Sequence, residues 1–175
     1  MARSRILRRR DRKSIAQWIK KVKKNRLPKD KSERLKIMKH KLALPYEVMG
    51  EGSKRLVYDL TKKSVLKVAI NEKGLRDNKR EIKIYRSAPR NLKKHLAKIR
   101  ENGAGWLIMD KINQIVPDTK KNKQKLKKLE KRFKKRGIIT DDLFSRSKKL
   151  KGSNTRLNKK GGMVVIDYGN FKRKK

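Results

Sequence analysis

The chain of 175 residues carries 57 lysines and arginines against 16 aspartates and glutamates, a formal net charge of +41. It contains no cysteine and two histidines, so the composition excludes disulfide bonds and thiolate metal sites and disfavours zinc enzymes, cysteine proteases and Ser–His–Asp hydrolases. No apolar run approaches the ~20 residues that cross a bilayer, and the basic N-terminus lacks the apolar stretch of a secretion signal.

The excess of positive charge predicts a polyanionic partner, nucleic acid above all, with an anionic membrane surface as the weaker alternative. The excess is uneven, because residues 1–44 carry net +15 whereas residues 51–110 carry net +9 over a longer stretch with clearer apolar patterning. With 34% hydrophobic residues, we expect a folded middle with basic segments attached to it. We expect a location in the cytoplasm or nucleoid, or in a virion if a phage encodes the chain.

Residues 1–43 are predicted to form a basic arm with two short helices, over residues 14–26 and 32–42. Ser14 and Ser32 are the expected helix caps. Each helix carries one apolar stripe, formed by Ile15, Trp18, Ile19 and Val22 in the first and by Leu35, Met38 and Leu42 in the second. These stripes must be buried against the downstream domain or against a partner, and an aromatic residue on such a stripe is more often core than base-stacking.

Three consecutive arginines precede the first helix: Arg8, Arg9 and Arg10. They are candidate nucleic-acid contacts or part of a localisation signal. A solvated, disordered arm is an equally good interpretation.

The segment from Leu44 to Ala69 predicts three antiparallel strands, around Val48, over residues 56–58 and over residues 64–70. Gly50 and Gly52 fall in the first turn. Because a strand rather than a helix follows these glycines, the dinucleotide-binding interpretation fails on context.

One lysine, Lys67, interrupts the apolar third strand, where an unpaired ammonium would be costly to bury. The next segment, residues 74–85, is predicted to be a helix that carries Glu81 on its apolar side, as a candidate partner for that lysine. A further apolar strand, residues 106–109, ends at Asp110.

The second half begins with a predicted helix over residues 120–136, which has a buried stripe of Leu126, Leu129 and Phe133 and an almost wholly basic outward face. The candidate nucleic-acid contacts on that face are Lys127, Lys128, Lys131, Lys134 and Lys135. Asp142 and Asn154 follow in loops. Asp167 comes after four apolar residues and before Tyr168-Gly169, where a strand would open into a site. Carboxylate and amide oxygens suit Mg²⁺.

Taken in order along the chain, these elements resemble the protein-kinase-like fold, and in particular the short kinase-like proteins of bacteriophages and bacteria. The motifs are Gly50-x-Gly52-x-x-x-x-Val57, Val65-Leu66-Lys67, Glu81, Met109-Asp110, Gly-Ile-Ile-Thr-Asp-Asp142-Leu, Asn154 and Asp167-Tyr168-Gly169. The resemblance implies an α+β fold with a small lobe over residues 44–112 and a truncated, mostly helical large lobe over residues 113–175.

The resemblance also implies roles for these residues, with ATP and Mg²⁺ as cofactors. Gly50, Gly52 and Val57 would cover the nucleotide, Lys67 (held by Glu81) would bind its phosphates, and Met109 and Asp110 would form the adenine hinge. Asn154 and Asp167 would bind the metal ion. Asp142 would accept the proton of the acceptor hydroxyl.

Four departures from the family pattern bear on activity. Arg55 replaces the third glycine of the loop, Thr140-Asp141 replaces His-Arg, and eleven residues instead of four separate Asp142 from Asn154. Only six residues follow Gly169, so we expect the activation segment and the later helices to be absent, unless a protein partner completes the lobe.

Two functional hypotheses follow from the sequence. One is an ATP-dependent, Ser/Thr-type phosphotransferase with affinity for nucleic acid. The other is a catalytically weak or inactive kinase-fold scaffold that binds nucleic acid, as a component of a phage virion or a nucleoprotein.

Overall fold

The computed structural model describes residues 4–24, 27–145, 147 and 149–174. The chain divides into two compact units. The N-terminal unit comprises residues 1–78 and 99–109, and the C-terminal unit comprises residues 79–98 and 110–175. Within the described residues, no helix combines the length and the apolar character needed to span a bilayer.

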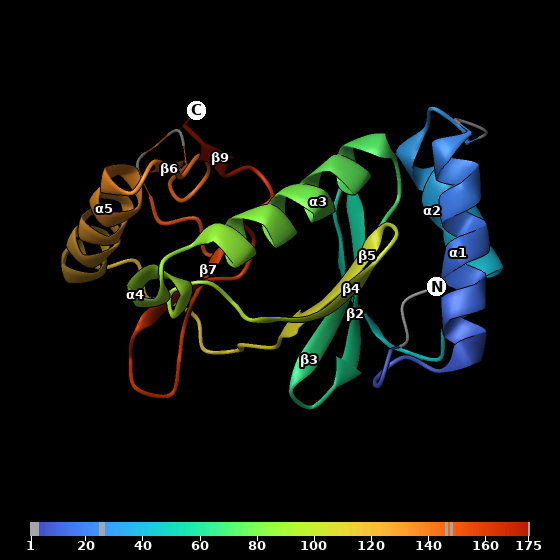
Figure 1. The fold of residues 1–175 in the computed structure, drawn as a ribbon, viewed down its shortest axis with the longest axis horizontal. Coiled ribbons are helices and arrows are strands. Elements are labelled where there is room, and N and C mark those ends of the chain that lie inside the picture. The colour runs from blue at the N-terminus through green and yellow to red at the C-terminus, as the bar shows by residue number, and fades with distance from the viewer. Residues whose placement is uncertain (1–3, 25–26, 146, 148, 175) are drawn as a thin grey trace. The chain divides into compact units, whose positions relative to one another are not determined.

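The N-terminal unit is built on a five-stranded antiparallel sheet in the order β1-β2-β3-β5-β4 (Figure 1). Its strands are β1 (Val48–Glu51), β2 (Arg55–Thr61), β3 (Ser64–Ala69), β4 (Ile99–Gly103) and β5 (Trp106–Asp110). The three predicted strands of the first meander are therefore confirmed, and so is the strand predicted over residues 106–109. The helix α3 (Glu72–Ser87) confirms the helix predicted over residues 74–85 and contributes residues to both units.

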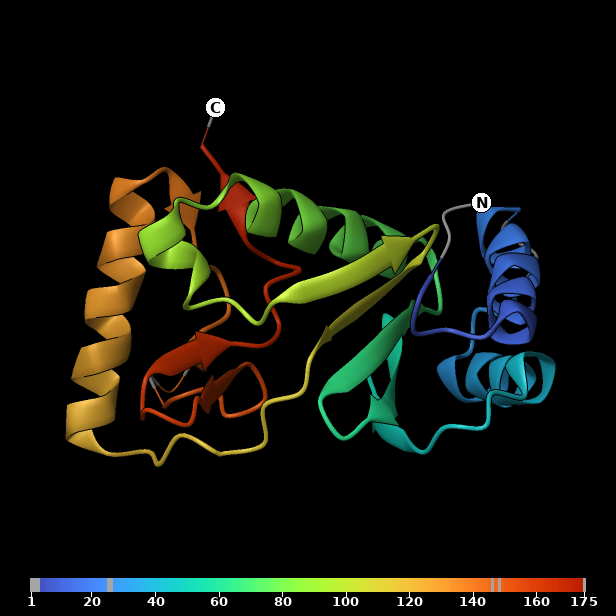
Figure 2. The same cartoon turned by 60° about the horizontal axis from the view of Figure 1, so that its bottom comes forward.

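Both predicted helices of the arm are present, as α1 (Arg9–Lys23) and α2 (Lys31–Leu42), and they pack side by side (Figure 2). The apolar stripes of both helices belong to one buried cluster with side chains of the sheet, among them Leu56 and Leu66. Trp18 is 1% exposed, and its Nε1 donates a hydrogen bond to the Ala69 carbonyl at 2.8 Å. The arm is thus a layer of the N-terminal unit, and Trp18 is a core residue.

The caps predicted for these helices are wrong. Helix α1 begins at Arg9, five residues before Ser14, and no side chain caps it. Its first turn instead holds Asp11, a buried carboxylate that accepts a hydrogen bond from the Tyr46 hydroxyl at 2.6 Å and complements the positive end of the helix dipole. In α2 the cap is Asp30 rather than Ser32, because the Asp30 carboxylate accepts from the Glu33 amide at 2.8 Å.

A tight turn joins β4 to β5. Gly105 has a φ of +79°, and a Cβ there would lie 2.3 Å from Cδ1 of Ile19. The Gly105 carbonyl accepts from the Ala69 amide and from the Asn78 side chain, both at 2.9 Å. Only glycine satisfies both the backbone conformation and the close approach of α1.

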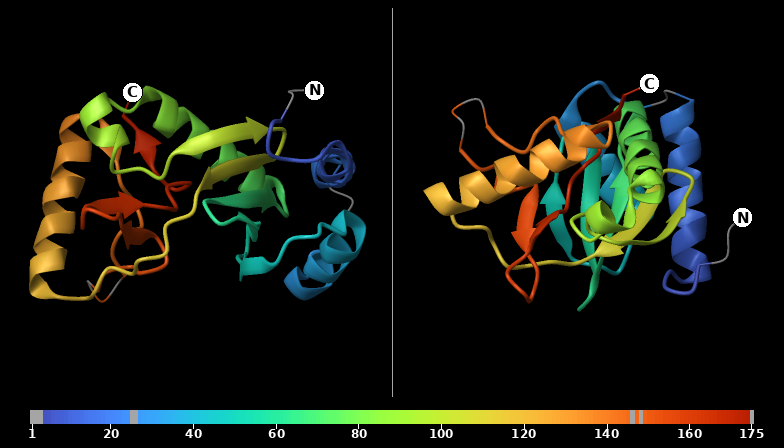
Figure 3. Two further views of the ribbon diagram at one scale, coloured as in Figure 1. Left: turned by 90° about the horizontal axis from the view of Figure 1, so that it is seen from below. Right: turned by 60° about the vertical axis from the view of Figure 1, so that its left-hand side comes forward.

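The C-terminal unit contains short elements around one long helix, α5 (Lys120–Lys135), which confirms the helix predicted over residues 120–136. The others are α4 (Arg90–Lys93), β6 (Ile138–Ile139), β7 (Thr155–Leu157), β8 (Met163–Val165) and β9 (Lys172–Arg173). Strands β6 and β9 pair antiparallel, and β7 and β8 form an antiparallel hairpin (Figure 3). Phe133 of α5 meets Phe171 edge-on, with ring centroids 5.8 Å apart, and Phe171 in turn lies 6.1 Å from Tyr168.

Candidate functional site

In the N-terminal unit, the predicted nucleotide-binding residues lie on the sheet. Gly50 of β1 pairs with Val57 of β2, and Val57 pairs with Lys67 of β3. Gly52 closes the β1–β2 turn by donating its amide to the Arg55 carbonyl at 3.0 Å. The Lys67 side chain is 5% exposed, so the ammonium predicted to interrupt an apolar strand is buried. Met109, on β5, is also buried.

Arg55, which replaces the third glycine of the kinase-like loop, has a structural place in this unit. Its side chain is buried, and Nη1 donates to Oδ1 of Asn78 at 3.3 Å. Beside it, Lys54 forms an ion pair with the buried Asp77 at 2.9 Å. The turn after β1 is therefore fastened to the first turns of α3 by side chains that a glycine could not supply.

Asp142 is held by several side chains of the C-terminal unit. Its φ is +88°, which is unusual for a residue with a side chain. Nδ2 of Asn154 donates to its carbonyl at 2.7 Å and to Oδ2 at 3.2 Å, and Nδ2 of Asn170 donates to Oδ2 at 3.1 Å. Lys151 forms an ion pair with Oδ1. Strained backbone held by several side chains is typical of functional sites.

The contact between Asp142 and Asn154 explains how the unit accommodates the eleven residues between them. The Lys151 amide donates to the Leu143 carbonyl at 3.1 Å, and Ser145 and Lys149 are joined by a backbone hydrogen bond at 2.9 Å. The insertion thus closes on itself as a small hairpin, although Arg146 and Lys148 of the predicted basic segment lie outside the described residues. Asn154 therefore contacts Asp142 despite the eleven residues between them.

The hairpin β7–β8 sets the two predicted metal ligands beside each other in the backbone. Asn154 directly precedes β7, Asp167 follows β8 after one residue, and the Ile166 amide donates to the Asn154 carbonyl at 2.8 Å. Among the described residues, no cluster of three or more His, Cys, Asp or Glu could hold a metal ion. The pair nevertheless fits Mg²⁺, which takes one or two carboxylates and completes its shell with water and phosphate oxygens.

Glu81 is fully buried on α3, as its position on the apolar side of the predicted helix indicated. Its Oε1 accepts the Tyr168 amide at 3.0 Å, and the Tyr168 hydroxyl donates to the Ala97 carbonyl at 2.9 Å. Arg80 donates to the Gly169 carbonyl at 2.7 Å. Consecutive residues of α3 therefore hold the Asp-Tyr-Gly segment within the C-terminal unit. The predicted pairing of Lys67 with Glu81 joins residues of different units and stays a prediction.

Asp110, the predicted hinge residue, donates its amide to the Lys98 carbonyl at 2.9 Å and lines a hollow of about 370 Å³ in the C-terminal unit. Asp142, Asn154 and Asp167 do not line that hollow.

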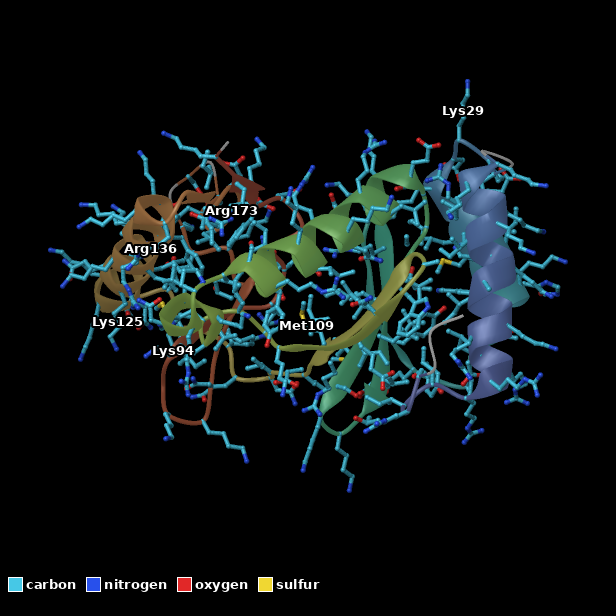
Figure 4. The ribbon with its side chains drawn as sticks, viewed as in Figure 1. Lys29, Lys94, Met109, Lys125, Arg136 and Arg173 are labelled. Carbon is cyan, nitrogen blue, oxygen red and sulfur yellow. The ribbon has the colours of Figure 1, made fainter. Side chains whose placement is uncertain are left out.

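The predicted nucleic-acid contacts lie on two helices. Arg8, Arg9 and Arg10 are exposed. Arg8 is the N-cap of α1 and the other two lie in its first turn, so this stretch of the arm is not disordered. The five lysines are exposed on α5: Lys127, Lys128, Lys131, Lys134 and Lys135. Figure 4 labels Lys125 on the same helix and Arg136, which directly follows its last residue. Glu130, the one acidic residue of α5, accepts the Thr140 hydroxyl at 3.1 Å.

Sequence analysis missed Lys151 and Asn170, which contact Asp142 directly. Lys151 was visible only as one of many basic residues in the insertion, and Asn170 follows Gly169 without any pattern around it. The sequence offered one clue: Lys151 lies three residues before Asn154, at the end of the insertion.

The sheet of the N-terminal unit and the Asp142 and Asp167 segments of the C-terminal unit define a protein with a mixed α+β, kinase-like fold. The solved structures that it resembles include two of the bifunctional kinase-methyltransferase WbdD, with TM-scores of 0.55 and 0.52 at 15% and 16% identity. These matches cover 74% and 70% of this chain but only 33% and 31% of the WbdD chains, so this chain matches about a third of their length.

The Legionella pneumophila kinase Lpg2603 also matches, over 74% of this chain and 50% of its own, at 19% identity and with a TM-score of 0.48. No protein-family model matches the sequence, and no curated protein matches it significantly.

Proposed function

We propose that the protein binds ATP with Mg²⁺ and transfers a phosphoryl group to a hydroxyl acceptor. The observation that carries this proposal is the fixed carboxylate of Asp142, which three side chains hold on a strained backbone although eleven residues separate it from Asn154. The kinase-like fold, established on structural likeness alone, adds independent support.

Each residue has a part in this proposal. Bound ATP would supply the phosphoryl group, and bound Mg²⁺, held by Asp167 and Asn154, would neutralise charge on its phosphates. Asp142 would take up the proton that the acceptor hydroxyl loses, at Oδ1 or Oδ2. Lys151 lies beside the same carboxylate, where its ammonium can attract an anionic donor. Buried Lys67 would bind phosphate oxygens.

The test measures transfer of radiolabelled γ-phosphate from ATP, with Mg²⁺, to the protein itself and to water. Asp142→Asn removes the base while suiting the positive φ, because asparagine tolerates that region. We expect Asp142→Asn to lower turnover by about 10²–10⁴-fold, as for removal of a general base. Lys67→Ala should act similarly, whereas Lys63→Ala, an exposed lysine of the β2–β3 turn, is the matched control. Wild-type protein without turnover, or equal turnover in Asp142→Asn, would refute the proposal.

A second proposed function is nucleic-acid binding, with or without catalysis. The supporting observation is α5, whose only acidic side chain, Glu130, is engaged with Thr140, while its exposed positions apart from Gln124 are lysine and arginine. Nothing on that helix neutralises the exposed face, so phosphate groups are its natural counter-ions. A catalytically inactive scaffold would keep this property.

The measurement is oligonucleotide affinity at several salt concentrations. Lys127→Gln with Lys128→Gln should weaken binding to every sequence and reduce the slope of log K against log salt by up to about 2, one for each lost phosphate contact. The control is Lys62→Gln with Lys63→Gln, which removes the same charge from the β2–β3 turn. An equal effect of both pairs would mean that net charge, rather than α5, determines affinity.

A further inference from the structure

The C-terminal unit contains a hollow of about 370 Å³ that is lined by ten residues of this unit alone. Its floor is apolar, formed by the buried Leu96 and Val164 together with Ile112. A volume of this size lies in the range of pockets for small molecules.

The wall of the hollow is strongly basic. Four of its side chains are basic, Arg90, Lys93, Lys94 and Lys98, against one acidic residue, Asp110. Lys93 is anchored, since its Nζ lies 3.3 Å from the Arg86 carbonyl and 5.3 Å from the centre of the Tyr85 ring. Like charges gathered around one hollow repel each other and lower the cost of binding an anion there.

The other three cations are available to a ligand. In the part of the chain that the structure describes, Arg90, Lys94 and Lys98 make no side-chain hydrogen bond or ion pair. Figure 4 marks Lys94 just beyond α4. All three are exposed, so an anion could reach them from solvent.

Two neutral donors complete the wall. Asn158 uses its Oδ1 within the β7–β8 turn, accepting from the amides of Lys160 at 3.0 Å and Gly162 at 2.8 Å, which leaves its NH₂ group as a donor. Tyr85 offers a phenol hydroxyl, and burial, with a smaller effect of Asp110, raises the pKa of that phenol. It therefore stays protonated and able to donate at neutral pH.

We propose that this hollow is a binding site for a small ligand that carries two or more phosphate groups. Arginine, lysine, amide and phenol groups are the donors that phosphate oxygens accept from. The apolar floor of Leu96, Ile112 and Val164 provides a surface for the ligand's carbon frame. The phosphates of a nucleic acid share this chemistry but belong to an extended chain, whereas the hollow is lined by ten residues of one unit.

The experiment is calorimetric titration of the full chain with inorganic tripolyphosphate at near-physiological salt. Lys94→Gln with Lys98→Gln removes two exposed charges without touching the core. We expect it to weaken binding by about tenfold or more, because charge-assisted contacts are the stronger hydrogen bonds. The matched control, Lys62→Gln with Lys63→Gln in the exposed β2–β3 turn, loses the same charge and should change affinity by less than about twofold, as expected for charges outside the site.

The outcomes separate this site from the proposed functions. Lys67→Ala removes the ammonium assigned to the phosphates of ATP, so loss of tripolyphosphate binding in that variant but not in Lys94→Gln with Lys98→Gln would place the ligand elsewhere and overturn the proposal. Equal losses of affinity in the hollow pair and in the β2–β3 turn pair would mean that net charge, rather than the hollow, determines binding. If the hollow pair affects only oligonucleotide binding, the hollow contacts nucleic acid instead. No detectable binding by wild-type protein would also overturn the proposal, whereas phosphate transfer is tested separately by the turnover of Asp142→Asn.

Discussion

Substitution of Trp18 tests whether the basic arm is part of the folded N-terminal unit. The indole is 1% exposed and donates to the Ala69 carbonyl at 2.8 Å. Trp18→Phe keeps most of the apolar surface but leaves that carbonyl without this donor, which costs about 1–3 kcal/mol. Trp18→Ala also opens a cavity among Ile15, Ile19 and the sheet, and removal of a buried aromatic side chain costs about 3–5 kcal/mol. We therefore expect the free energy of unfolding to fall from wild type to Trp18→Phe and further to Trp18→Ala.

The assay is urea unfolding followed by the fluorescence of Trp106, which is buried on β5 of the same unit and is the only tryptophan left in these variants. Circular dichroism on the same samples shows whether unfolding is a single transition. Lys20→Ala, an exposed position of α1, is the control and should change the free energy of unfolding by less than about 0.5 kcal/mol. A loss below about 1 kcal/mol for Trp18→Ala would refute the packing of the arm on the sheet.

Two further changes test one position in each unit. Gly105→Ala should destabilise the N-terminal unit by about 1–3 kcal/mol, because φ is +79° and the new Cβ would lie 2.3 Å from Ile19; Gly152→Ala, which meets nothing within 4 Å, should be nearly neutral in the same denaturation assay. In the C-terminal unit, burial lowers the pKa of His95. The nearby charges of Arg132 and Lys94 lower this pKa further, whereas the hydrogen bond with the Met163 backbone raises it. The unfolded chain then takes up a proton near pH 6.5 before the folded chain does, so the free energy of unfolding should fall as pH drops below about 6.5. His95→Gln should flatten that part of the pH profile, and an unchanged slope would contradict the assignment.

The strands and long helices could be predicted because their side chains repeat with the period of the element. Lys67 stood out as one charge in an apolar strand, and Glu81 as one carboxylate on the buried side of a helix; both are buried in the structure. In each case the signal lay within about ten consecutive residues. The fold class followed from the order of these elements, and likeness to solved kinase-like structures supports it.

Helix boundaries and loop closure could not be predicted in this way. The start of α1 depends on Asp11 and on the Tyr46 hydroxyl, thirty-five residues later, whereas the sequence offered only Ser14 as a local cap. The approach of Asn154 to Asp142 depends on a hairpin closed by the backbones of Leu143 and Lys151. Such contacts are set by tertiary structure and leave no periodic trace.

Several acidic residues are engaged within the fold and add little negative charge to the exposed surface. Asp11, Asp77 and Glu81 are buried, with hydrogen bonds or ion pairs to Tyr46, Lys54 and Tyr168. Glu130 is likewise engaged with Thr140. These carboxylates stabilise the interior, so they screen little of the charge that the exposed lysines and arginines present to solvent. On α5 a polyanion would meet exposed lysines and arginines without an exposed acid of that helix. The salt slope of α5 and the phosphate affinity of the C-terminal hollow are therefore sharper tests than net charge.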